Sequence, residues 1–190
     1  ETITDCLKGE RVESPKDTSL DILDYSTGFT RPRARIVTNE NRPLNIVVAV
    51  ARFTWMIAGN NRVHDIAYYE PKVAGFTDNG LTVPGSCYGN RLFEARPGLN
   101  QLVGVVDRLA RDPHTRRASA VVWAPEDAVR QSNDIPCTFG VFFHVREERL
   151  VMQTIMRSNN AYRILPFNLF EFSMLQELVA AQLGRELGPY

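Results

Sequence analysis

Hydrophobic residues along the chain fall into runs with two different periods, one helical and one alternating. Residues 44–58 form an apolar run without proline that ends at the next glycine, which predicts a mostly buried helix. Asn100 is a favourable N-cap, and the apolar residues that follow it at helical spacing predict a second helix ending before Asp112. A third helix is predicted over 169–183, because a glycine follows it.

Alternating polar and apolar residues predict strands in the second half of the chain. The apolar run 118–123 predicts one strand, and two alternating runs within 138–157, around the charged turn 146–149, predict a β-hairpin. The first 43 residues are polar and turn-rich, so we expect loops and short strands there, and residues 59–100 are expected to be irregular. The order of these elements predicts an α+β fold with a mainly antiparallel sheet.

The composition is that of one ordinary globular domain covering residues 1–190. The 22 Lys and Arg residues balance the 22 Asp and Glu residues, which argues against a general nucleic-acid binder because such proteins need a basic surplus. No apolar run approaches the roughly 20 residues that cross a bilayer, so we expect no membrane span. Three cysteines without CxxC spacing match neither a disulfide framework nor a zinc site, which indicates a cytoplasmic protein without a bound metal.

Arginine dominates the basic residues, since only three of the 22 are lysine. A guanidinium group binds phosphate or carboxylate through two parallel hydrogen bonds, and the adjacent Arg116 and Arg117 are suited to gripping one phosphate. A GC-rich genome produces the same bias, and a solvated turn is the ordinary interpretation of the Arg pair. Composition alone therefore leaves both interpretations open.

Cys137 is the candidate nucleophile among the three cysteines. It follows a proline and precedes a predicted strand, where a buried structural thiol is the other interpretation. A thiol reacts as the thiolate, which a nearby cation favours, and Arg157 lies on the neighbouring strand of the predicted hairpin. The histidines, His64, His114 and His144, lack metal-ligand spacing and give no support to a Cys–His protease dyad.

The segment 157–168 is difficult to explain as structure alone. It places amides, a hydroxyl and cations between a hydrophobic strand and a hydrophobic helix. Buried polar groups without partners cost a few kcal/mol each. We therefore expect these side chains to bind one another or a ligand.

Short motifs spread over nearly the whole chain resemble those of the thymidylate synthase superfamily, in the family's order and approximate spacing. They are Trp55 to Asn61, Tyr88-Gly89, Asp112-Pro113 through Arg116-Arg117, Pro136-Cys137, Arg157-Ser158 and Pro166-Phe167-Asn168. The resemblance implies an α+β fold that forms a homodimer through its sheet. It also implies that a cysteine thiolate adds to C6 of a pyrimidine nucleoside monophosphate, after which C5 takes a one-carbon unit from 5,10-methylenetetrahydrofolate.

The resemblance also assigns roles at the reacting base. Cys137 is then the nucleophile, Arg157 helps to activate its thiol, and Tyr88 assists proton removal from C5. Asn168 reads the pyrimidine edge. Its carboxamide can accept from N3–H and donate to O4, which favours uracil over cytosine.

Phosphate binding is implied for a second set of residues. These are Lys16, in a phosphate loop, together with Arg116, Arg117, Arg157 and Ser158. Of these, Arg116 and Arg117 are expected to reach the phosphate in the partner subunit's site.

Departures from the family pattern are concentrated on the folate side. The family's catalytic glutamate is Arg52 here, and an arginine is not a general acid or base near neutral pH. The folate-contacting aspartate is Asn160, and Arg163 replaces the first residue of a Leu-Gly pair. No tryptophan occurs over 69–75, where synthases place one near the transferred carbon. Hydroxymethylation is therefore favoured over methylation, as in the nucleotide (dCMP, CMP or dUMP) hydroxymethylase-like branch.

Two alternative functions remain. The same cysteine can act on a pyrimidine nucleotide without folate, or the chain can be a non-catalytic nucleotide-binding homologue.

Compared with the family, residues 187–190 come just before the expected ribose-binding strand and closing tail. We therefore expect a single domain of this family without its sugar clamp.

Overall fold

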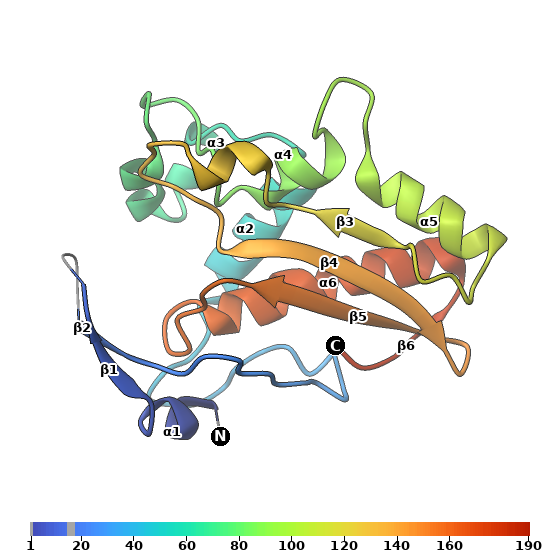
Figure 1. Ribbon diagram of the computed structural model, residues 1–190, viewed down its shortest axis with the longest axis horizontal. Helices are drawn as coiled ribbons and strands as arrows, with labels where there is room; N and C mark the ends of the chain where they lie inside the picture. Colours follow the sequence, from blue (N-terminus) through green and yellow to red (C-terminus); the bar gives the residue numbers. More distant parts are fainter. Residues whose placement is uncertain (1, 15–17) are drawn as a thin grey trace.

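A four-stranded sheet and the helices that cover one of its faces form the body of the protein, as the computed structural model shows (Figure 1). The structure describes residues 2–14 and 18–190. In chain order the elements are α1 (Thr2–Cys6), β1 (Glu10–Glu13), β2 (Thr18–Asp21), α2 (Ile46–Ile57), α3 (His64–Ala67), the 3-10 helix η1 (Pro71–Phe76), α4 (Tyr88–Phe93), α5 (Gln101–Arg111), β3 (Ser119–Val121), the 3-10 helix η2 (Pro125–Ala128), β4 (Thr138–Arg146), β5 (Arg149–Met156), α6 (Leu165–Leu183) and β6 (Glu186–Leu187).

The sheet has the strand order β3-β4-β5-β6. The first three strands are antiparallel, and β6 runs parallel to β5. The register shifts between Thr138 and Gly140, where a Cβ atom on Gly140 would lie only 2.7 Å from the carbonyl oxygen of Ala120. The predicted hairpin and the predicted α+β fold with a mainly antiparallel sheet are both confirmed.

Two helix boundaries predicted from the sequence are present, the start of α5 and the end of α2. The Asn100 side chain accepts hydrogen bonds from the backbone N–H groups of Leu102 and Val103 at 3.0 Å, so α5 begins where expected. Helix α2 also ends as predicted, at a glycine, since Gly59 has a φ of 70°. Local signals were sufficient here because each helix is long enough to show its period.

Helix α6 starts four residues earlier than predicted. Its first turn contains Pro166, which lacks the backbone N–H that would be unsatisfied there and therefore favours this position. The helix ends as expected before Gly184, whose φ is 61°. The early start places Asn168 within the helix, where its side chain is buried.

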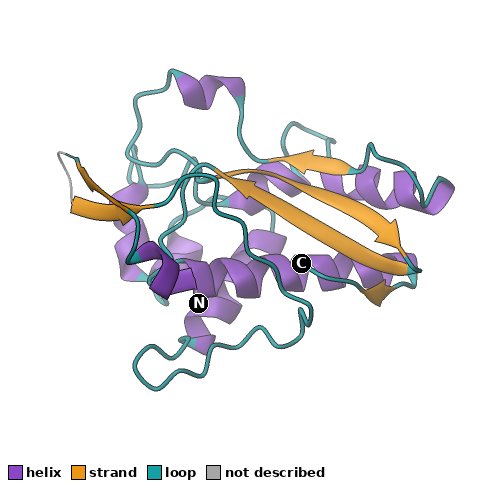
Figure 2. Cartoon of the chain, turned by 60° about the horizontal axis from the view of Figure 1, so that its bottom comes forward, coloured by secondary structure: helices purple, strands orange, loops and turns teal. Residues whose placement is uncertain are grey.

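The main core lies between α6 and the inner face of the sheet. Figure 2 shows α6 lying along the β4–β5 hairpin. The largest fully buried side chains in this layer come from both sides, and they are Phe143, Leu150, Met152, Phe172 and Leu175. Because α6 is surrounded by protein on several sides, a charged residue within it must be paired.

The region 59–100 is less irregular than predicted, since it contains α3, η1 and α4. These elements have four to six residues each, too few to show a helical period in the sequence. Within the described residues, no helix is both long and apolar enough to cross a membrane.

Candidate active site

Cys137 and Arg157 meet at the open end of the β4–β5 hairpin. Cys137 directly precedes β4, and Arg157 directly follows β5, so the antiparallel pairing brings them together. The Arg157 backbone N–H donates to the Cys137 carbonyl at 2.9 Å. Its guanidinium donates to the carbonyls of Pro136 and Ile135, both at 3.0 Å. The predicted proximity of the thiol and the cation is confirmed, while the role of each residue stays a prediction.

Opposing electrostatic effects act on the Cys137 thiol. Burial raises its pKa, the Arg157 guanidinium acts in the opposite direction, and the Asp134 carboxylate adds to the increase. The thiol is therefore mainly protonated at neutral pH, and Arg157 is the group that favours its ionisation to the thiolate.

The alkylation rate of Cys137 tests this electrostatic balance. We expect the Arg157→Gln variant to react about three to ten times more slowly with iodoacetamide at pH 7, because removing the cation raises the pKa of Cys137. The Asp134→Asn variant should react faster. Arg146→Gln, at the far end of the hairpin, is the control. Mass spectrometry of the Cys137 peptide measures the alkylation rate. Equal rates in the unsubstituted protein and all three variants would contradict the proposed balance.

Tyr88 is the first residue of α4 and is buried near the Cys137 thiol. Its ring stacks on Phe172 with a centroid distance of 5.7 Å. Burial raises the pKa of Tyr88, and the nearby Cys137 and Glu171 contribute to the increase. The phenol therefore stays protonated at neutral pH and can donate a hydrogen bond.

Asp134 fixes the loop before Tyr88 against the loop before Cys137. Its carboxylate accepts from the backbone N–H groups of Gly85 at 2.7 Å and Ser86 at 2.5 Å, and from the Ser86 hydroxyl. The sequence motifs did not single out Asp134. A carboxylate three residues before a candidate nucleophile was the available signal, but its partners are about 50 residues away.

Asn168 lies in the first turn of α6, and its amide contacts the segment that follows β5. Its Nδ2 donates to Oδ1 of Asn159 at 3.2 Å. Its Oδ1 is buried and has no hydrogen-bond partner among the described residues. The side chain therefore offers a free acceptor at a buried position.

Arg52, which is predicted to replace the family's glutamate, is held by two acidic residues. Its Nε donates to Glu171 at 2.5 Å, and its Nη1 donates to Glu70 at 3.2 Å. The sequence motifs did not single out Glu171. It is the only charged residue in the run from Pro166 to Leu175, and that isolation was a usable signal.

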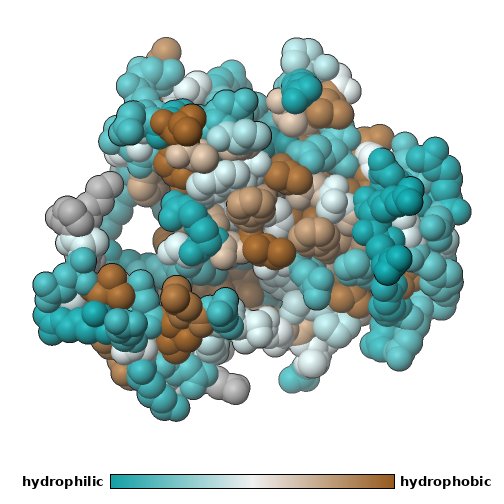
Figure 3. Space-filling model, in the orientation of Figure 1, coloured by the Kyte–Doolittle hydropathy of each residue, from teal (hydrophilic) through white to brown (hydrophobic). Residues whose placement is uncertain are grey.

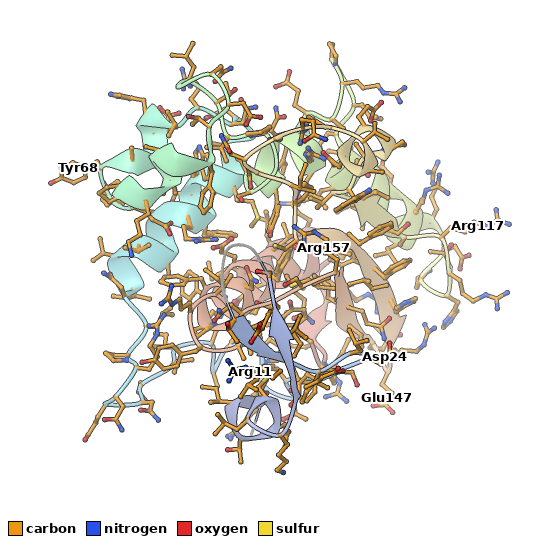
Figure 4. All side chains as sticks on the ribbon, turned by 60° about the vertical axis from the view of Figure 1, so that its left-hand side comes forward. Arg11, Asp24, Tyr68, Arg117, Glu147 and Arg157 are labelled. Carbon is orange, nitrogen blue, oxygen red and sulfur yellow. The ribbon has the colours of Figure 1, made fainter. Side chains whose placement is uncertain are left out.

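The predicted phosphate-binding residues are not all brought together. Ser158 is exposed and follows Arg157 directly. Arg116 and Arg117 are exposed in the loop between α5 and β3, and Arg117 projects from the edge of the molecule well apart from Arg157 (Figure 4). Lys16 lies outside the described residues. The phosphate roles of these residues stay predictions.

Asn160 and Arg163 lie in the turn between β5 and α6. The Asn160 side chain accepts from the backbone N–H groups of Tyr162 and Arg163, at 3.2 and 2.7 Å. Arg42 donates to the carbonyls of Tyr162 and Arg163, and its guanidinium lies 5.8 Å from the Phe167 ring centroid. This turn thus presents aromatic and cationic groups beside the site. No cluster of three or more metal-ligating side chains is found among residues 2–14 and 18–190.

Comparisons with known proteins identify what the chain is similar to. A family model described as thymidylate synthase matches residues 21–190. The deoxyuridylate hydroxymethyltransferase of Delftia phage PhiW-14 is 30% identical over 175 residues, which cover 85% of this chain and 48% of that protein. A thymidylate synthase of Bacillus licheniformis is 33% identical over 179 residues, covering 90% of this chain and 63% of that protein.

A solved structure has the same fold. Thermostable thymidylate synthase A from Bacillus subtilis superimposes with a TM-score of 0.71 at 23% identity, covering 86% of this chain and 60% of that one. The chain spans about half the length of the phage relatives it matches.

Proposed function

Because the chain belongs to the thymidylate synthase family, we propose that it modifies C5 of a pyrimidine nucleoside monophosphate by covalent catalysis. The observation that carries this proposal is the pairing of Cys137 with Arg157 at the end of the hairpin. Two relatives of similar identity are named for one-carbon chemistry on this class of compound.

The first step is addition of the Cys137 thiolate to C6 of the pyrimidine. The sulfur–C6 bond forms, and the electron pair of the C5–C6 double bond shifts toward the C4 carbonyl, which makes C5 nucleophilic. Arg157 favours the thiolate, as its effect on the Cys137 pKa indicates. We propose that Arg157 and Ser158 also contact the nucleotide phosphate, since both lie beside the thiol at the surface.

Uracil is the base that Asn168 fits. Its Nδ2 is engaged by Asn159, which leaves Oδ1 to accept a hydrogen bond. Uracil presents a donor to this oxygen at N3, whereas neutral cytosine presents an acceptor at N3 and a donor only at its 4-amino group. The name of the phage relative, a deoxyuridylate enzyme, points in the same direction.

5,10-Methylenetetrahydrofolate fits the groups beside this site. The ligand carries a reduced pterin, an aromatic aminobenzoyl ring and an anionic tail. The turn offers the exposed Arg163 cation and Asn160, and the first turn of α6 adds the Phe167 ring. When bound, it supplies the one-carbon unit that C5 accepts. Arg52 replaces the usual glutamate here, and we propose that the transferred carbon is hydrated to hydroxymethyl rather than reduced.

We propose that two copies of the chain form a homodimer through the outer faces of their sheets. Val121, Phe139 and Ile155 are exposed there, although they are strand residues. Figure 3 shows hydrophobic side chains gathered at the centre of the face where β4 and β5 lie in Figure 1. Such a patch favours a self-complementary interface. Arg116 and Arg117 would then serve the partner's phosphate.

Release of tritium from C5 tests the proposed function. UMP, dUMP, CMP and dCMP labelled at C5 are incubated with the protein, with and without 5,10-methylenetetrahydrofolate. We expect release from a uracil nucleotide that depends on the folate. Release that persists without folate would favour the folate-independent alternative. No release from any of the four nucleotides would contradict the proposal.

A further inference from the structure

A buried carboxylate beside Tyr88 has no role in the steps above. Glu171 lies in α6 between two phenylalanines and is only 3% exposed. A carboxylate at such a position is costly unless it is paired. It follows Asn168 by three residues, so the two side chains share one face of the helix.

Arg52 holds Glu171 in one orientation. The Arg52 Nε donates to Oε1 of Glu171, while its Nη1 is engaged by Glu70. The second oxygen, Oε2 of Glu171, has no hydrogen-bond partner in the described parts of the chain. The ion pair therefore fixes the carboxylate and leaves one of its oxygens available.

A small cavity of about 10 Å³ is lined by both this carboxylate and the tyrosine. Its polar lining consists of Arg52, Ser86, Cys87, Tyr88 and Glu171. A cavity of this size holds about one water molecule, provided that it has two or more polar partners, as this one does. Tyr88 in turn interacts electrostatically with both Cys137 and Glu171, so it links the cavity to the thiol.

We propose that Glu171 accepts the proton removed from C5, through one water held in this cavity against the Tyr88 hydroxyl. The inference rests on the proposed function. The C5–H bond breaks, and its electron pair remains on the nucleotide as part of a C4–C5 enolate. The water takes that proton and passes one of its own to Oε2 of Glu171. Burial raises the pKa of Glu171, while Arg52 acts in the opposite direction, and its hydrogen bond orients the carboxylate until that step.

The Glu171→Gln variant tests this assignment, because it keeps the shape of the side chain and removes its basicity. We expect kcat for C5 tritium release to fall by about 100-fold or more, with KM for the nucleotide changed less than about threefold. Glu171→Asp should restore part of the rate. Glu70→Gln is the matched control, since it removes the other carboxylate on Arg52 and should keep kcat within about threefold.

A double variant distinguishes the loss of the base from a folding defect. Arg52→Gln combined with Glu171→Gln leaves no unpaired buried charge, so it should fold and bind nucleotide yet release tritium as slowly as Glu171→Gln. A Glu171→Gln protein that keeps kcat within threefold of the unsubstituted chain would overturn the role of Glu171 and leave the proposed function standing. Failure of the unsubstituted chain to release tritium from any nucleotide would overturn both.

Discussion

Replacing Cys137 with alanine lowers C5 tritium release by about 1,000-fold or more, while nucleotide binding persists. The loss is this large because no other group can form the bond to C6, and the reaction then has no covalent path. Binding survives because Asn168 and Arg157 are unchanged. The measurements are the tritium assay and calorimetric titration with the nucleotide.

The control for this prediction is another cysteine of the same chain. Cys6 lies in α1, far along the chain from the hairpin, and Cys6→Ala should retain full activity. Unchanged release in Cys137→Ala would exclude covalent catalysis by this residue. Binding without release in both the unsubstituted chain and the variant would instead favour a non-catalytic nucleotide-binding protein.

Replacing Gly89 with alanine lowers the free energy of unfolding by about 3 kcal/mol. A Cβ atom at this position would lie 1.8 Å from the carbonyl oxygen of Met56, so α4 must move away from α2. That displacement also moves Tyr88, the preceding residue, and we expect C5 tritium release to fall with stability. Urea denaturation followed by circular dichroism measures the change.

Gly104→Ala is the matched control for Gly89→Ala. Gly104 lies within α5, and a Cβ atom there would contact nothing within 4 Å. Gly104→Ala should therefore raise the free energy of unfolding by about 0.5–1 kcal/mol, because alanine favours the helix. Equal stability of the Gly89→Ala and unsubstituted proteins would show that α2 and α4 are not packed as described.

Local patterns were sufficient for the elements whose signals lie within one turn or one strand pair. Asn100 caps α5 through its own neighbours, and the hairpin follows from alternation on both sides of a charged turn. The start of α6 was missed because Pro166 resembles a helix breaker when only its sequence position is considered, although it is favourable in a first turn. The short elements between 59 and 100 are specified by packing rather than by period.

Contacts between distant residues account for what the sequence could not predict in the site. The motifs predicted that Cys137, Arg157 and Asn168 belong together, and the hairpin explains the first two. The Arg52–Glu171 pair joins residues 119 positions apart, and Asp134 reaches back 49 positions to Gly85. The identity of each residue was visible in the sequence, but the packing of α2 against α6 brings Arg52 to Glu171, and a contact between two loops brings Asp134 to Gly85.

The most direct test of the account is a covalent adduct at Cys137. A uracil nucleotide with fluorine at C5 cannot lose a proton there, so the reaction should stop with the nucleotide attached to the protein. Incubation with this analogue and 5,10-methylenetetrahydrofolate, followed by digestion and mass spectrometry, locates the bond. The account predicts a nucleotide adduct on the peptide that contains Cys137, and none in Cys137→Ala. An adduct on Cys6 or Cys87, or a bound nucleotide with no adduct on any cysteine, would contradict it.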